Sequence, residues 1–189
     1  MALLLLAGVA WLAGCNSQPI AKEHSPNVTV LDLENRTVNP FHEQTAKAII
    51  FFFVGTDCPI SNRYAPEIER LAERYARESL AFWLVYPESS TTREEIEQHR
   101  KEYHLSLQAL RDPRHALVKL SKVKVTPEAA VFLPDGQEVY RGRIDDRYMD
   151  FGKKRPTPTT HDLDEVLRSL IAGKAVAISK TRAIGCYIE

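Results

Sequence analysis

The chain has 189 residues, of which 44% are hydrophobic and 26% are charged, with 25 basic and 25 acidic side chains. This composition is typical of one globular domain and excludes collagen-like, disordered and polytopic membrane proteins. Because the formal net charge is +0, the chain as a whole is not attracted to nucleic acid, and we expect no nucleic-acid partner. Three cysteines are too few for a disulfide scaffold at this length, so each one needs its own explanation.

An uncharged apolar run, residues 1–14, ends directly at Cys15. As a helix this run would be about 21 Å long, which is short of the roughly 30 Å hydrocarbon core of a membrane. Its length and the small residues at its end are typical of a signal peptide for secretion. The alternative is a buried hydrophobic arm with an ordinary cysteine. The sequence Leu12-Ala13-Gly14-Cys15 resembles the bacterial lipobox, which implies cleavage before Cys15 and a diacylglycerol on its sulfur.

Residues 15–27 are mostly polar and contain two prolines, so we expect a flexible tether there. The lipid on Cys15 would attach the protein to a membrane of the cell envelope, facing the periplasm or the exterior. Cys58 and Cys186 would then be the remaining thiols, in a compartment where thiols are oxidised unless something reduces them.

The first half of the body predicts alternating strands and helices. A loosely alternating stretch at residues 28–33 predicts a strand. Residues 48–54 are apolar without alternation, as in a strand buried on both faces of a sheet. Apolar residues then recur every three or four positions from Ile60 to Tyr75, which predicts an amphipathic helix. The next elements are an apolar strand at residues 80–86 and a charged surface helix at residues 92–103, which begins at a capping box, Thr91 to Glu94.

The second half predicts shorter elements around a hairpin. In order, these are a strand at residues 107–110, a helix at 116–120, hairpin strands at 129–133 and 138–144, and a final helix at 162–171 capped by Thr159 or Thr160. The hairpin turn contains Asp135-Gly136, since Asp-Gly adopts turn conformations easily. Residues 145–160 show no periodicity and predict a long loop, of a kind that is often functional or mobile. This order describes one domain, residues 28–173, followed by a C-terminal tail, residues 174–189.

Cys58 lies between the buried strand and the amphipathic helix, in the motif Gly55-Thr56-Asp57-Cys58-Pro59-Ile60-Ser61. A thiol at this position faces the positive end of the helix macrodipole, which favours the thiolate and therefore nucleophilic attack. Pro59 suits the first helical turn, where its missing N–H is not needed. Asp57 acts in the opposite sense, because a nearby carboxylate disfavours a second negative charge. The alternative is a cysteine packed as a small hydrophobic side chain.

A strand, Cys-Pro-Ile-Ser and a helix, followed by further strands and helices in the order β-α-β-β-α, resemble the thioredoxin fold. Within it, the chain resembles the redoxin group, which includes alkyl hydroperoxide reductase/thiol-specific antioxidant proteins and TlpA-like tethered thiol-disulfide proteins. Pro66 matches the family's helix proline, eight residues after Cys58, and Thr126-Pro127 matches the family's cis-proline before the hairpin. The fold implied is α/β, with a mixed central sheet flanked by helices.

The resemblance implies an exported thiol-disulfide oxidoreductase that needs no metal or organic cofactor. Cys58 would be the attacking thiolate, supported by Ser61 and by its neighbour Pro59. Pro127 would shape a groove for an extended substrate, and Thr126 would pair with the substrate backbone. The implied partners are protein dithiols or disulfides in the cell envelope.

Ser61 stands where the second cysteine of the redox motif is expected. A Cys-x-x-Ser site forms a mixed disulfide but has no thiol within the motif to resolve it. Cys186, in the tail, is either the missing resolving thiol or a thiol without a part in the reaction, inert or paired with another molecule. The sequence leaves both interpretations open.

Two other activities stay open. A thiol peroxidase would share the nucleophile Cys58, but the peroxide-binding Pro-x-x-x-Thr-x-x-Cys pattern has Phe51 and Gly55 at its Pro and Thr positions. A copper or metal carrier of the Sco type would use Cys58, Cys186 and a histidine, for which His161 is the candidate. His161 lies at a helix start, where an exposed histidine without a ligand role is the alternative.

The apolar run before Cys15 predicts a lipidated mature N-terminus. Mass spectrometry of the membrane fraction is expected to show a chain that begins at an acylated Cys15. A soluble protein that retains an unmodified Met1 would contradict this prediction.

Overall fold

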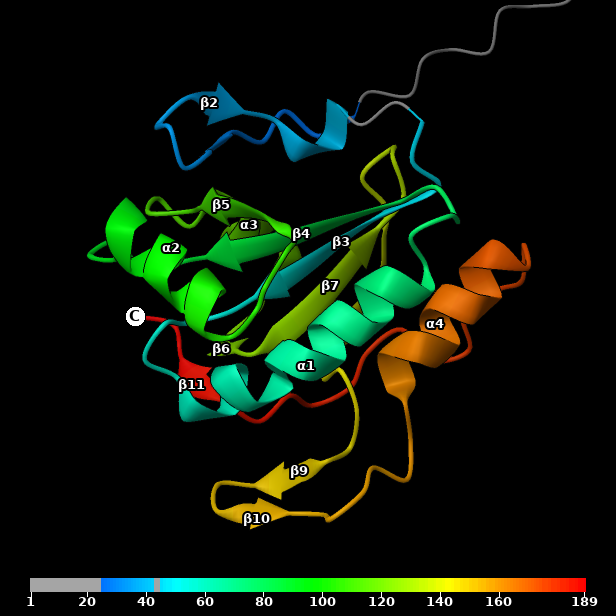
Figure 1. The fold of residues 1–189 in the computed structure, drawn as a ribbon. Coiled ribbons are helices and arrows are strands. Elements are labelled where there is room, and N and C mark those ends of the chain that lie inside the picture. The colour runs from blue at the N-terminus through cyan, green and yellow to red at the C-terminus, as the bar shows by residue number, and fades with distance from the viewer. Residues whose placement is uncertain (1–24, 43–44) are drawn as a thin grey trace, which may run out of the picture.

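The computed structural model describes residues 25–42 and 45–189 and shows an α/β fold with a mixed central sheet flanked by helices (Figure 1). The predicted signal, Cys15 and most of the predicted tether lie outside the described residues. Within the described ranges, no helix is long and apolar enough to cross a membrane.

The central sheet has seven strands in the order β2-β1-β5-β4-β3-β7-β8. They are β1 (Val30–Leu31), β2 (Thr37–Val38), β3 (Ala48–Phe53), β4 (Leu80–Tyr86), β5 (Gln108–Arg111), β7 (Glu128–Phe132) and β8 (Glu138–Gly142). β3 pairs parallel with β4 and antiparallel with β7. β3 is therefore an interior strand of the sheet, and the chain that leaves its end leads to Cys58.

Every residue of β3 is buried because both faces of the sheet are covered. Ile50 and Phe52 pack toward α1 (Pro59–Arg74) and α4 (Asp162–Ile171), which lie side by side on one face (Figure 1). Ile49, Phe51 and Phe53 pack on the other face, against α3 (Ala116–Ser121) and the 3-10 helix Pro40–His42. Alternate side chains of a strand point to opposite faces, so two cores of opposite side chains explain the unbroken apolar run.

The predicted capping box of the surface helix is displaced by one residue. The helix is α2 (Arg93–Glu102), and its N-cap is Thr92. The Thr92 hydroxyl accepts from the backbone N–H of Glu95, while the Glu95 carboxylate accepts from the N–H of Thr92. The reciprocal bonds need a spacing of three residues, which Thr92 and Glu95 provide in helical register.

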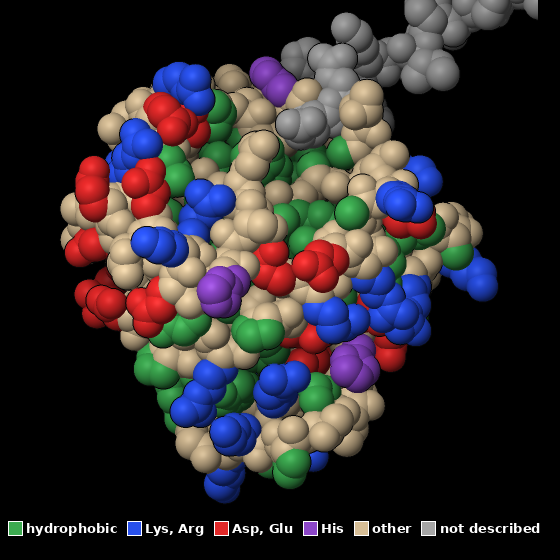
Figure 2. Space-filling view, in the orientation of Figure 1, with side chains coloured by type: hydrophobic (Ala, Val, Ile, Leu, Met, Phe, Trp, Pro, Cys, Tyr) green, Lys and Arg blue, Asp and Glu red, His purple; other side chains and the backbone are tan. Residues whose placement is uncertain are grey.

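The predicted loop at residues 145–160 contains a small hairpin, β9 (Tyr148–Asp150) and β10 (Lys153–Lys154), which projects from the body (Figure 1). Its strands are short and largely exposed, so no apolar alternation marks them in the sequence. In Figure 2, basic side chains gather over the part where this hairpin projects, and acidic side chains gather over α2.

The predicted cap of the final helix is wrong. His161 is the N-cap of α4 and its side chain makes no capping hydrogen bond. The backbone N–H groups of Thr159 and Thr160 donate instead to the carboxylate of Asp146, at 2.6 and 3.0 Å. Through these bonds the two threonines hold Asp146 in place at the base of the projecting hairpin.

The packing of α1 predicts the cost of truncating a buried side chain in the helix that Cys58 caps. Ile68 is fully buried against the sheet, so Ile68→Ala is expected to lower the free energy of unfolding by about 2–5 kcal/mol. Glu73→Ala, at an exposed position of the same helix, is the matched control and is expected to change it by less than about 0.5 kcal/mol. Urea unfolding followed by circular dichroism measures both, and equal effects of the two variants would contradict this packing.

Candidate active site

Cys58 caps the N-terminus of α1 and is 3% exposed. Its sulfur accepts a long hydrogen bond from the backbone N–H of Ser61, at 3.5 Å, as an N-cap side chain does. As a thiol it also donates to the backbone carbonyl of Thr126, at 2.9 Å. The first contact favours the thiolate, whereas the second favours the neutral thiol. Pro59 follows as the first residue of α1 and is exposed.

The Thr126-Pro127 bond is cis, as the resemblance implied. It follows β6 (Val125–Thr126) and lies beside Cys58, since the Thr126 carbonyl contacts the sulfur. Gly55 permits this approach, because a Cβ at its position would lie 3.1 Å from the Thr126 hydroxyl oxygen. The Gly55 N–H donates to the Ser61 hydroxyl, so Ser61 also fastens the turn before Cys58.

The C-terminal tail returns to this site. Its strand β11 (Cys186–Tyr187) pairs antiparallel with β6, so that Cys186 lies opposite Thr126 (Figure 1). Gly185 makes the approach possible, because a Cβ there would lie 2.1 Å from the Thr126 carbonyl oxygen. Both Cys58 and Cys186 are free thiols in this structure. The fold therefore brings Cys58 and Cys186, which are far apart in the sequence, to opposite sides of Thr126.

The pKa values of the two thiols shift in opposite directions. Burial by itself raises the pKa of Cys58, but hydrogen bonds from the thiol and N–H of Cys186 and from Ser61 outweigh it, so the pKa lies below its ordinary value. Burial raises the pKa of Cys186 to about 12, and its hydrogen bond to Cys58 and the charge on that sulfur act in the same direction. When one of the two thiols ionises, the charge is therefore on Cys58 and the proton stays on Cys186.

A buried histidine that the sequence analysis missed supports the turn before Cys58. The Asn62 side-chain NH₂ donates to the carbonyl of Thr56, at 3.1 Å, which directs its oxygen toward His99 Nε2, at 2.9 Å. His99 Nε2 must therefore carry the proton, and Nδ1 accepts from the Tyr86 hydroxyl, at 2.8 Å. Burial lowers the pKa of His99, in keeping with a neutral ring. The sequence signal for the burial of His99 is its position three residues after Ile96, which places both residues on the same face of the helix.

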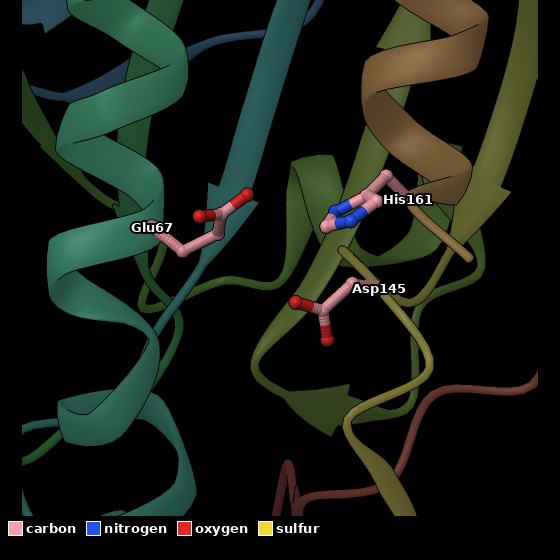
Figure 3. A group of neighbouring side chains, drawn as sticks. All are labelled: Glu67, Asp145 and His161. Atoms are coloured by element: carbon pink, nitrogen blue, oxygen red, sulfur yellow. The ribbon is translucent and has the colours of Figure 1, made fainter. Parts of the chain in front are cut away.

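His161 lies in a different place. Figure 3 shows it with Glu67 and Asp145, and one ligating atom from each lies within 4.8 Å of the others. Each carboxylate already has a cationic neighbour: Arg70 binds Glu67 at 2.6 Å, and Arg147 lies 3.7 Å from Asp145. This is the one group of three potential metal ligands among the described residues, and it contains neither cysteine. The structure therefore does not assemble the predicted set of Cys58, Cys186 and His161.

The hydrogen bond from Cys186 predicts a change in the acidity of Cys58. Cys186→Ala removes the side-chain donor, so the pKa of Cys58 is expected to rise and its alkylation by iodoacetamide to require higher pH. Cys186→Ser keeps an O–H donor and is expected to shift the pH profile less. Mass spectrometry of the Cys58 peptide after timed alkylation measures both profiles, and identical profiles for the two variants would contradict the contact.

Comparisons with known proteins agree with this geometry. Residues 46–138 match the family described as Thioredoxin-like. A hypothetical protein from Sinorhizobium meliloti has a similar structure, with 21% identity, a TM-score of 0.74 and coverage of 90% of this chain and 95% of that one. An uncharacterized conserved protein from Geobacillus kaustophilus has 22% identity, a TM-score of 0.74 and coverage of 92% and 93%.

A more distant match is a thiol-disulfide oxidoreductase from Bacteroides fragilis, with 17% identity, a TM-score of 0.54 and coverage of 62% of this chain and 88% of that one. No curated protein matches the chain. The sheet order, the cis-proline beside Cys58 and the similar solved structures lead to one conclusion: this chain has a thioredoxin-like α/β fold.

Proposed function

We propose that the protein is a thiol-disulfide oxidoreductase in which Cys58 is the nucleophile and Cys186 is the resolving thiol. The observation that carries this proposal is the β6–β11 register, which sets Cys186 opposite Thr126 while Thr126 contacts the Cys58 sulfur. The distant match to a thiol-disulfide oxidoreductase supports the same chemistry.

The reaction follows from the acidities of the two sulfurs. The Cys58 thiolate attacks a substrate disulfide and forms a mixed disulfide, and one substrate sulfur leaves and takes up a proton. The Cys186 thiol then attacks the Cys58 sulfur, loses its proton to the departing second substrate sulfur, and leaves a Cys58–Cys186 disulfide. Two electrons have passed to the substrate, and the same steps in reverse oxidise a dithiol.

The positions of the two cysteines favour this resolution step. A disulfide requires Cα atoms within about 7 Å, and the register that sets Cys186 opposite Thr126, whose carbonyl contacts the Cys58 sulfur, supports such an approach. A bridge that closes a segment this long would restrict the unfolded chain by roughly 4–5 kcal/mol. In this proposal Cys186 supplies the second thiol of the reaction, because the usual position of that thiol in the motif is occupied by Ser61.

We also propose where the protein acts and on what. The partners are protein dithiols or disulfides of the cell envelope. The attachment is a lipid on Cys15, for which the sequence Leu12-Ala13-Gly14-Cys15 is the support.

The proposed mechanism predicts a specific peptide pair. Oxidised full-length protein, digested without reductant, is expected to yield the Cys58 and Cys186 peptides joined by a disulfide. Cys58→Ser is expected to abolish turnover of a disulfide substrate, whereas Cys186→Ser is expected to accumulate the mixed disulfide on Cys58. Full turnover in Cys186→Ser, with no joined peptide in the wild type, would overturn the role of Cys186. Hydrogen peroxide consumption that exceeds disulfide turnover would assign the protein to the peroxidases instead.

A further inference from the structure

A hollow of about 470 Å³ lies between the tail and the body, next to the strand pair that holds Cys186. Its lining is strongly basic and comes from both segments. The cations are Lys122, Lys124 and Arg141 from the body, and Lys180 and Arg182 from the tail.

The positive charge of the hollow is poorly compensated. Glu128 is its one acidic lining residue, and that carboxylate is buried and accepts from the backbone N–H groups of Lys124 and Val125. Arg141 lies 4.0 Å from Glu138. The other four cations form no ion pair with any residue in the described ranges, so the hollow has an excess of positive charge.

The floor of the hollow is formed by a buried side chain that hydrogen bonds hold in place. Arg141 is 9% exposed, and its guanidinium donates to the carbonyls of Ser121 and Lys122, at 2.9 and 2.8 Å. Its backbone pairs with the tail, through the Thr181 N–H to the Arg141 carbonyl and the Arg141 N–H to the Ser179 carbonyl, both at 3.0 Å. A buried, fixed cation therefore lies where the tail docks.

When the tail is docked, its cations lie in the same hollow as those of the body. Lys180 and Arg182 line the same space as Lys122 and Lys124, so like charges oppose docking of a segment whose strand is only two residues long. An anion in the hollow would be attracted to cations of both segments and would remove this opposition.

We propose that the hollow binds a compact oxyanion, a phosphate or a small polycarboxylate, and that the bound anion holds the tail on β6 with Cys186 against Cys58. An anion that binds only the docked form raises the ratio of docked to undocked protein by a factor of one plus its concentration divided by its Kd. The anion would therefore regulate how readily the two cysteines meet. This consequence rests on the proposed function, whereas the binding site does not.

The test uses the full-length reduced protein with inorganic phosphate or citrate as the probe. Calorimetry measures binding, and hydrogen exchange measures docking, because the Ile188 N–H donates to the Lys124 carbonyl when the tail is docked. At ten times the Kd, exchange in the tail peptide is expected to slow by about tenfold. Comparison of phosphate with citrate identifies the preferred oxyanion, and sodium chloride keeps the ionic strength constant.

The matched variants separate this site from general charge effects. Lys180→Gln with Arg182→Gln is expected to lose both anion binding and the slowing of exchange that the anion causes. Lys153→Gln with Lys154→Gln, which removes two exposed lysines of the projecting hairpin, is expected to keep both.

Absence of binding would overturn the site, as would equal protection by sodium chloride alone or unchanged binding in the Lys180 and Arg182 variant. Binding without slower exchange would overturn the coupling to the tail. These readouts need no turnover, so a failure of the proposed disulfide chemistry would appear separately, as the absence of the Cys58–Cys186 peptide.

Discussion

The close approach of three backbone segments around one sulfur determines most of this structure's chemistry. The start of α1, the cis-proline turn and the tail all meet at Cys58, and glycines make room for them. Gly55 leaves space beside the Thr126 hydroxyl, and Gly185 leaves space against the Thr126 carbonyl. Because Thr126 is shared by both contacts, it links the nucleophile to the tail cysteine. A side chain at Gly185 would collide with the backbone of Thr126 and separate the tail from it, whereas a side chain at Gly55 would press on the Thr126 hydroxyl.

The same arrangement shifts the pKa values of the two cysteines in opposite directions. Burial alone would raise the pKa of both thiols, so the difference comes from hydrogen bonds to Cys58 at the start of a helix. Cys186 lies on a two-residue strand of the tail. Burial raises the pKa of its thiol, and the interaction with Cys58 acts in the same direction. Cys58 is therefore buried where the start of α1 meets Thr126, while Cys186 is supplied by a two-residue strand of the tail. That division suits a reaction in which a substrate sulfur must enter and leave between the two.

Sequence patterns predicted the fold well where local physics dominates. The apolar strand β4 and the helix α4 occur at the predicted residues, because their side-chain periodicity reflects burial directly. The hairpin β9–β10 could not be predicted, since its exposed strands carry no such periodicity. For the site, the motif placed Cys58 at a helix start, but the contact with Cys186 depends on a long-range strand pairing that no local pattern encodes. The role of His99 likewise arises from a tertiary hydrogen-bond chain through Asn62.

The central claim is that Cys58 and Cys186 form one intramolecular redox couple. Equilibration of the purified protein in glutathione buffers tests it most directly, with acid quenching and mass spectrometry of each cysteine. An intramolecular disulfide exchanges two electrons with two glutathione molecules. The oxidised fraction should therefore depend on the squared concentration of reduced glutathione divided by that of the disulfide, with no glutathione retained on the protein. Oxidation that instead follows the simple ratio, with glutathione attached to Cys58, would contradict the account.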